Sequence, residues 1–272
     1  MPQIAGSSTL VTGGGSGLGE AVARRFVAHG GKVVISGRRA DRIAAVAADI
    51  GPNCRAVTGD VADDDDRRAM IEAAVEFGGG LTTLVNAAGN MYRGPIGSFT
   101  DEALLGIYHS NVVGPMQLTG IALPHLKASS GSVIVFGSVH TQRAFPGASP
   151  YAATKGALET LTGVLAAELG PAHVRFNCVR PGGVHTEINE RAGLVTAETG
   201  LARLQNLAPA HALGRIGTPD EIAEAVEYLA VADWVTGTIL TVDGGLSLGV
   251  TDDTPPPSES SSPAGAARAS RA

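Results

Sequence analysis

Short runs of apolar residues alternate with longer stretches of helical periodicity through most of the chain. Runs such as VVI, TLV, VIVF and TILTV are continuous, which is typical of parallel strands covered by helices on both faces. They predict strands at Thr9–Thr12, Lys32–Ser36, Arg55–Thr58, Thr83–Asn86, Ser132–Phe136, Val174–Val179 and Ile239–Val242. The periodic stretches predict helices near Gly17–Ala28, Asp41–Ile50, Asp63–Phe77, Asp101–Leu126, Tyr151–Leu169 and Pro219–Ala230. This alternation predicts right-handed βαβ units and an α/β fold with a doubly wound, mostly parallel seven-stranded sheet and helices on both faces.

Two segments break the alternation. Residues 186–217 have mixed polarity, contain Pro209 and are too long for a simple connection, so we expect them to form a substrate lid. From Thr251 onward the chain is rich in Pro, Ser and Ala without periodicity, which is typical of disorder. We therefore expect one domain over residues 1–250 and a disordered tail over residues 251–272.

The composition restricts the kinds of partner. A chain of 272 residues, 44% of them hydrophobic, is long enough for one large domain with a buried core. The formal net charge of −6 argues against nucleic acid as a partner. No apolar stretch reaches membrane-spanning length, and the start MPQIAGSSTL lacks the features of a signal peptide. Cys54 and Cys178 alone give neither a disulfide framework nor a zinc site. We expect a cytoplasmic protein with no membrane partner and no metal.

Tyr151, Lys155 and Ser138 are candidates for proton-transfer chemistry. A phenol has an ordinary pKa near ~10 and is a poor acid or base at neutral pH. Lys155 lies four residues further along the predicted helix, on the same face, where its ammonium would lower the pKa of Tyr151. Ser138 ends the preceding strand, and its hydroxyl can hydrogen-bond the same substrate oxygen. An isolated pair of this spacing is usually a solvated surface pair, so the interpretation depends on the rest of the chain.

The turn after the first predicted strand, Thr12 to Gly19, is rich in glycine. Glycine lets the backbone approach an anionic group, and the following helix offers free N–H groups and the positive end of its dipole. No lysine follows the last glycine, so the phosphate loop of nucleotide hydrolases is not matched, and the spacing also differs from G-x-G-x-x-G. A turn that binds nothing is the alternative. Its place at the first strand–helix corner of a doubly wound sheet favours a dinucleotide site instead.

Seven short motifs occur in an order and spacing that are specific together. They are Thr12-Gly13-x-x-x-Gly17-x-Gly19, Asp60-Val61, Asn86-Ala87-Ala88-Gly89, Asn111, the Ser138/Tyr151/Lys155 set, Pro181-Gly182 with Thr186, and Val242-Asp243-Gly244-Gly245. On these motifs the chain resembles a classical short-chain dehydrogenase/reductase over about residues 5–250. The resemblance implies a Rossmann-like fold and a nicotinamide dinucleotide cofactor.

The resemblance also implies a role for each matching residue. Tyr151 would be the general acid in reduction and the base in oxidation, and Ser138 would hold the carbonyl oxygen. Lys155 would hydrogen-bond the nicotinamide ribose, and Asn111 would interrupt its helix to position a water that links Lys155 to solvent. The expected cofactor-binding residues are Thr12, Gly13, Gly15, Ser16, Gly17, Leu18, Gly19, Arg38, Arg39, Asp60, Val61, Asn86, Ala88, Gly89, Tyr151, Lys155, Pro181, Gly182, Val184 and Thr186.

The residues after the second predicted strand bear on the choice of cofactor. Members that prefer NAD generally carry an acidic residue where Gly37 stands, and here Arg38 and Arg39 follow instead. A guanidinium is suited to the 2′-phosphate of NADP, although two arginines at a strand end can be merely solvated. Ser16 also occupies a position that is often basic in NADP-binding relatives. We expect NADP(H) to be favoured over NAD(H).

The substrate is expected to be a small or medium carbonyl/alcohol pair. Ser138, His140 and Gln142 are candidates to contact it, together with Phe145, Asn90, Met91 and the lid. His140 stands where relatives usually have a small residue, yet a lone histidine in a loop is more often structural or solvated. Two alternatives stay open: an NAD-dependent alcohol dehydrogenase of the same fold, and a non-catalytic dinucleotide-binding regulator.

The resemblance further implies a homo-oligomer, most readily a tetramer, built through the predicted helices 101–126 and 151–169. The second of these carries a wide band of small and apolar residues. Part of that band must cover the sheet, and the alternative is that all of it does.

Overall fold

The computed structural model describes residues 3–191 and 196–249, so the expected tail lies outside the described residues. The strands are β1 Ser8–Thr12, β2 Lys32–Gly37, β3 Cys54–Thr58, β4 Thr83–Asn86, β5 Ser132–Phe136, β6 Arg175–Pro181 and β7 Ile239–Val242. The α-helices are α1 Gly17–Ala28, α2 Ala40–Ile50, α3 Asp64–Gly78, α4 Asp101–Tyr108, α5 Gly114–Ser129, α6 Ser149–Leu169, α7 Ile188–Arg191, α8 Ala197–Gln205 and α9 Pro219–Val231. All seven predicted strands are confirmed, with ends that differ by at most two residues.

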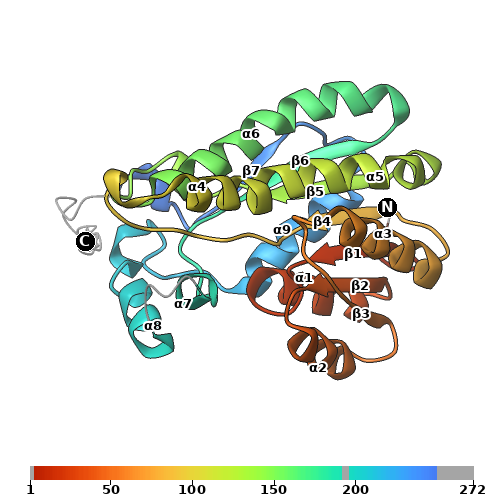
Figure 1. Cartoon of the computed structure of the whole chain (residues 1–272), viewed down its shortest axis with the longest axis horizontal. Coiled ribbons are helices and arrows are strands. Elements are labelled where there is room, and N and C mark those ends of the chain that lie inside the picture. Colours follow the sequence, from red (N-terminus) through yellow and green to blue (C-terminus); the bar gives the residue numbers. More distant parts are fainter. Residues whose placement is uncertain (1–2, 192–195, 250–272) are drawn as a thin grey trace, which may run out of the picture.

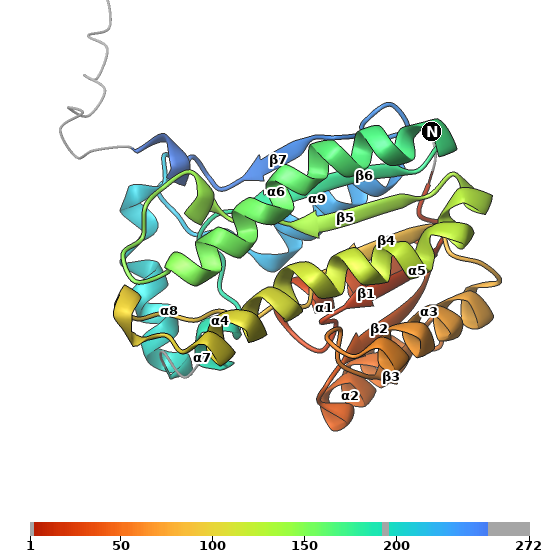
Figure 2. The same cartoon turned by 45° about the horizontal axis from the view of Figure 1, so that its top comes forward.

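The strands form one parallel sheet in the order β3-β2-β1-β4-β5-β6-β7 (Figure 1). The order reverses between β1 and β4, and in open α/β sheets ligands bind outside the carboxyl ends of the strands at such a point. The strand arrows end on the side of the molecule that carries α4, α7 and α8 (Figure 2). The fold therefore directs the glycine-rich turn after β1 toward this end.

Successive strand residues are buried against opposite layers of helices. Leu10 packs in the cluster that contains residues of α3, α5 and α6, whereas Val11 packs in the cluster that contains residues of α1, α2 and α9. The pairs Val34/Val33 and Leu84/Val85 alternate in the same way. Burial on both faces is the physical reason for the continuous apolar runs, and it confirms the doubly wound, Rossmann-like architecture.

The predicted helix over 101–126 is not one regular helix. The structure divides it into α4, a π-helical turn at His109–Val113, and α5, and Asn111 lies in the π-helical turn. A π-helical turn widens the backbone spiral and commonly marks a functional position. The interruption expected at Asn111 is therefore present, and the predicted range 101–126 covers two α-helices with the π-helical turn between them.

The segment expected to be a lid contains the short helices α7 and α8, which the sequence pattern did not predict. Across residues 3–191 and 196–249, no helix combines the length and the apolar character that crossing a membrane requires.

Candidate active site

The carboxyl ends of the strands open into a cavity of about 290 Å³. Its walls come from the turn after β1, the segments after β4, β5 and β6, the start of α6, and the helices α7 and α8. Ser138, Tyr151 and Lys155 line this cavity together with Gly13 and Gly17 of the glycine-rich turn. The structure thus brings the two predicted sites, proton-transfer residues and glycine-rich turn, into one space.

The glycine-rich turn is closed tightly against the segment after β4. Gly13 has a φ of +68°, and a Cβ at this position would lie 2.8 Å from backbone atoms of Ala88. Thr12 Oγ1 accepts a hydrogen bond from the main-chain N–H of Ala88 at 3.0 Å. Ser16 is the N-cap residue of α1, and its side chain makes no capping bond. The first N–H groups of α1 are therefore not capped by the Ser16 side chain, and such groups are suited to binding an anion.

His140 fixes the direction of the Ser138 hydroxyl. Arg93 Nη2 lies 3.2 Å from His140 Nε2, and His140 Nδ1 lies 3.0 Å from Ser138 Oγ. Because a guanidinium can only donate, Nε2 accepts, and Nδ1 therefore carries the ring proton and donates to Ser138. The main-chain N–H of His140 donates to the same oxygen at 3.3 Å. With two bonds accepted, the Ser138 hydroxyl still has its own proton to donate.

The ring of His140 is held in its neutral form. Burial, and then the charge of Arg93, lower the pKa of His140 to about 4. Its ring lies against Phe145 at 4.4 Å between centroids and meets the ring of Tyr151 edge-on at 5.2 Å. His140 is therefore a packed member of the site.

Lys155 is buried at the inner end of the cavity. Its Nζ donates to the main-chain carbonyl of Phe136 at 2.9 Å and lies 5.5 Å from the centroid of the Tyr151 ring. Burial lowers the pKa of Lys155 to about 8, while the neighbouring Cys178 and Glu159 act in the opposite direction. The ammonium is thus present at neutral pH, close to the phenol.

Tyr151 does not have the lowered pKa that the sequence predicts. Burial of the side chain raises the pKa of Tyr151, and hydrogen bonding with Ser138 and the charge of Arg93 only oppose this rise. The expectation took account of the Lys155 charge and not of desolvation, which dominates here. The phenol is therefore protonated at neutral pH.

Asn111 connects the segment after β4 to α6. Its side-chain carbonyl accepts from the main-chain N–H of Asn90 at 2.8 Å, and its amide donates to the Asn90 carbonyl and to Thr154 Oγ1. A Cβ added to Gly89 would lie 3.3 Å from Asn111 Oδ1 and 3.9 Å from Lys155 Nζ. Asn111 and Lys155 thus lie beside one another, and the role of Asn111 toward a water stays a prediction.

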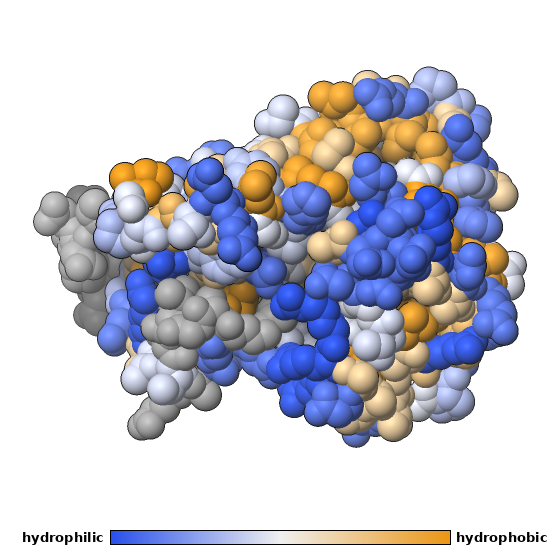
Figure 3. All heavy atoms as spheres, in the orientation of Figure 1, coloured by the Kyte–Doolittle hydropathy of each residue, from blue (hydrophilic) through white to orange (hydrophobic). Residues whose placement is uncertain are grey.

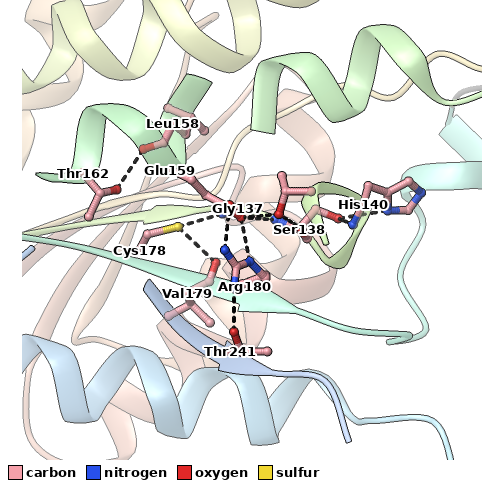
Figure 4. Close-up of polar contacts among 11 residues, drawn as sticks. Gly137, Ser138, His140, Leu158, Glu159, Thr162, Cys178, Val179, Arg180 and Thr241 are labelled. Carbon is pink, nitrogen blue, oxygen red and sulfur yellow. Dashed lines mark hydrogen bonds and ion pairs between the residues drawn. The ribbon is translucent and has the colours of Figure 1, made fainter. Parts of the chain in front are cut away.

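A buried ion pair supports the loop that carries Ser138 (Figure 4). Glu159 of α6 pairs with Arg180 of β6, with side chains only 9% and 12% exposed and a closest distance of 2.8 Å. Glu159 Oε1 also accepts from Thr141 Oγ1 at 2.9 Å and from the main-chain N–H of Ser138 at 3.4 Å. Cys178 is buried, and its thiol accepts from the main-chain N–H that precedes Ser138.

The arginines expected to bind the adenosine end carry carboxylate partners. Arg38 is exposed and lies 3.6 Å from Asp60. Arg39 and Arg42 both bind Glu187 of the lid segment, at 3.1 and 2.9 Å. Arg42 also donates to a main-chain carbonyl of the glycine-rich turn at 3.0 Å. Arg42 and Glu187 were not predicted as site residues, because nothing in the sequence indicates that positions 145 residues apart form an ion pair.

The other predicted cofactor residues differ in their placement. Ser16, Leu18, Gly19, Gly89, Pro181, Gly182, Val184 and Thr186 line the cavity. A Cβ on Gly17 would lie 3.2 Å from the Thr186 side chain, so Thr186 packs closely against the glycine-rich turn. Asn86 is buried, and neither polar atom of its side chain has a partner among the described residues. Gln142, a candidate substrate residue, is exposed and does not line the cavity.

These features fit a dinucleotide that extends from the glycine-rich turn to Tyr151. Comparisons with known proteins agree with that fit. A family model described as enoyl-(acyl carrier protein) reductase matches residues 13–247. An uncharacterised oxidoreductase of Methylorubrum extorquens is 37% identical over 252 residues, which are 90% of this chain and 100% of that protein. The chain belongs to the short-chain dehydrogenase/reductase family.

Two further relatives of this family have more specific names. The L-fucose dehydrogenase of Bos taurus is 36% identical over 91% of this chain and 92% of its own. A 3-ketoacyl-(acyl-carrier-protein) reductase from Brucella melitensis, solved in complex with NADH, is similar with a TM-score of 0.80 and 32% identity over 90% of this chain and 99% of its own. As a short-chain dehydrogenase/reductase, the protein is an oxidoreductase that acts on CH–OH or C=O groups with a nicotinamide cofactor.

Proposed function

We propose that this short-chain dehydrogenase/reductase interconverts a carbonyl and a secondary alcohol, with Tyr151 as the acid or base and with NADP(H) favoured over NAD(H). The observation that carries the proposal is the single cavity in which Ser138, Tyr151 and Lys155 line one end and the glycine-rich turn lines the other. Residues 186–217 act as its lid.

The proton step follows from the state of Tyr151. A bound reduced nicotinamide supplies hydride chemistry at the carbonyl carbon. The Tyr151 phenol, which is protonated because burial raises its pKa, donates a proton to the carbonyl oxygen. The Ser138 hydroxyl donates a hydrogen bond to the same oxygen and stabilises the charge that develops there. In the oxidative direction Tyr151 would have to act as the phenolate, and the raised pKa lowers the fraction of phenolate at neutral pH.

Lys155 acts on Tyr151 through charge and on the cofactor through its ammonium. Its Nζ is fixed by the Phe136 carbonyl and has two further donors, which suit a ribose hydroxyl. At the other end of the cavity, the N-terminus of α1 binds the diphosphate, and Asn86 supplies a buried amide that has no partner among the described residues.

The preference for NADP(H) rests on charge beside the second strand. No carboxylate stands at Gly37 to accept from ribose hydroxyls, whereas the guanidinium groups of Arg38, Arg39 and Arg42 gather there. A 2′-phosphate would compete with Asp60 and Glu187 for these groups. NAD(H) is the second candidate, because the Brucella melitensis relative was solved with NADH.

Two assays test this proposal. Turnover of a panel of carbonyl compounds is measured with NADPH and with NADH as the loss of absorbance of the reduced cofactor. Binding of each cofactor is measured by fluorescence. We expect oxidation of NADPH with a higher kcat/KM than that of NADH. Binding of either cofactor without turnover of any carbonyl would instead support a non-catalytic dinucleotide-binding protein.

A further inference from the structure

The cavity beside Tyr151 contains an arginine that is not paired with a carboxylate among the described residues. Arg93 follows β4 and is half-buried, and its one side-chain hydrogen bond among the described residues is to the neutral ring of His140. Its Nε is buried and has no partner there. Arg203 of α8 lines the same cavity and, like Arg93, makes no ion pair within the described part of the chain.

Arginines elsewhere in the protein that are withdrawn from water have partners: Arg175 donates to two main-chain carbonyls of α9, and two others are paired with carboxylates. Arg180 is matched by Glu159, and Arg67, which is 8% exposed, is matched by Asp64 at 3.1 Å. Among the described residues that line the cavity, the one acidic residue is Glu187, which is already bound by Arg39 and Arg42. The charge beside Tyr151 is therefore left positive by the protein itself.

A guanidinium that is half-removed from water without a counter-charge is unfavourable, and a second guanidinium nearby increases the cost. Burial, and then the charge of Arg203, lower the pKa of Arg93, which shows that the cation is destabilised where it stands. An anion in the cavity would remove this cost and gain charge-assisted hydrogen bonds from a planar fork of donors.

The phosphates of the cofactor are not that anion. Their site is the glycine-rich turn and the N-terminus of α1, whereas Arg93 contacts His140 at the Ser138 and Tyr151 end of the cavity. We infer that the substrate carries an anionic group, a carboxylate or a phosphate, which Arg93 binds next to the reacting carbonyl, with Arg203 adding charge from α8. This substrate class rests on the proposed function, since it places the anion beside the proton donor.

The experiment compares matched pairs of carbonyl compounds that differ in charge. Acetoacetate is tested against methyl acetoacetate, and dihydroxyacetone phosphate against dihydroxyacetone, with the same reduced cofactor. The first pair probes a carboxylate and the second a phosphate. Wild type should favour the charged member of at least one pair by about ten- to a hundredfold in kcat/KM, the value of a charge-assisted hydrogen bond. Arg93→Met should abolish that ratio through KM, and Arg93→Lys should retain part of it.

The ratio of kcat/KM for the charged compound to that for the neutral one distinguishes anion binding by Arg93 from an effect of Arg93 on His140. If Arg93 acted only by orienting His140 and Ser138, Arg93→Met would lower kcat for charged and neutral compounds equally, which overturns the inference. Arg55→Met, which removes an exposed arginine paired with Glu76, is the control for loss of one positive charge. The Kd for the reduced cofactor should be the same in Arg93→Met and wild type, and a large loss of cofactor affinity would place the anion on the cofactor instead.

Calorimetry keeps the inference distinct from the proposed function. The cofactor-bound protein is titrated with acetoacetate and with dihydroxyacetone phosphate, without any need for turnover. Binding to wild type that is lost in Arg93→Met supports the inference even if no carbonyl is reduced, in which case the proposed function alone has failed. A wild-type protein that reduces the neutral compounds as well as the charged ones, and binds neither anion, overturns the inference and leaves the proposed function standing.

Discussion

Tyr151 is buried, and its raised pKa leaves a proton on the phenol at neutral pH. Tyr151→Phe removes this proton and keeps the ring against His140, so cofactor binding should stay nearly unchanged. A positioned proton donor contributes on the order of 10²–10⁴-fold, and kcat for carbonyl reduction should fall by that factor. Single-turnover kinetics with bound NADPH, beside a fluorescence titration of the cofactor, measures both quantities. A variant that retained most of its rate would remove Tyr151 from the mechanism.

The lowered pKa of His140 makes the free energy of unfolding depend on pH in a direction that can be predicted. Its pKa is about 4 in the folded chain and about 6.5 when unfolded, so between these values the unfolded state binds more protons. The free energy of unfolding therefore falls as the pH drops through this window, by on the order of 3 kcal/mol in full. His140→Gln should lose that component and leave stability at pH 7 less affected. Urea unfolding of both proteins at several pH values measures the difference, and parallel pH profiles would contradict it.

Arg38 follows β2, and we propose that its guanidinium binds the 2′-phosphate of NADP(H). Arg38→Ala should raise the KM for NADPH by about ten- to a hundredfold, as expected for loss of a charge-assisted hydrogen bond, and change that for NADH much less. Arg55→Ala serves as a matched control, because it also removes an exposed arginine that pairs with one carboxylate. Equal effects of Arg38→Ala on both cofactors would show that this guanidinium does not read the phosphate.

At the scale of elements, α6 and β6 are joined through Glu159 and Arg180. Glu159→Gln would leave the Arg180 guanidinium buried without its counter-charge, and such a loss costs roughly 3–5 kcal/mol. Glu168→Gln, an exposed change on the same helix, should cost little. Replacing Glu159 and Arg180 together by leucine should recover much of the loss, because no unpaired charge then stays buried. Urea unfolding of the wild type and of these variants tests this, and a Glu159→Gln protein as stable as wild type would contradict it.

The helices and strands were predictable where hydrophobic periodicity or capping residues of the local sequence determine them. The parallel strands are apolar because both faces are covered, and Thr218-Pro219 predicted a helix start that the structure confirms as a capping box with Glu221. The π-helical turn at Asn111 was anticipated only through the family resemblance, since periodicity alone reads through it. The short helices α7 and α8 have mixed polarity and were read as an irregular lid.

Site residues that act through distant partners were not predictable. Arg93 is separated from His140 by 47 residues, and Arg42 from Glu187 by 145, so no spacing rule connects them. The direction of the Tyr151 pKa was predicted wrongly for a related reason, because depth of burial is a property of the whole fold. Gln142 was a candidate to contact the substrate because it lies four residues after Ser138, but it is exposed in the structure.

At the scale of the whole molecule, one layer of helices leaves apolar side chains in contact with solvent. Leu105 and Tyr108 of α4, Met116 of α5 and Val164 of α6 are all exposed, Met116 by 43% and Val164 by 49%. In both views α4 continues into α5, and α6 lies alongside them on the same side of the sheet (Figures 1 and 2). Hydrophobic residues also gather on the surface over α5 and α6 (Figure 3). The band predicted along α6 is therefore only partly used to cover the sheet.

Symmetric assembly is the common way to bury such a surface, so a homo-oligomer, most readily a tetramer, stays our prediction for this chain. Val164→Glu places a charge in the middle of the exposed band and should lower the mass found by light scattering. Ala45→Glu, on the exposed side of α2, is the matched control and should leave the mass unchanged. A chain that ends at Val250 should keep the wild-type number of subunits, because a segment rich in Pro, Ser and Ala lacks the apolar side chains that a packed interface requires. A monomeric wild type would refute the assembly, whereas dissociation of the shortened chain would refute only the claim about the tail.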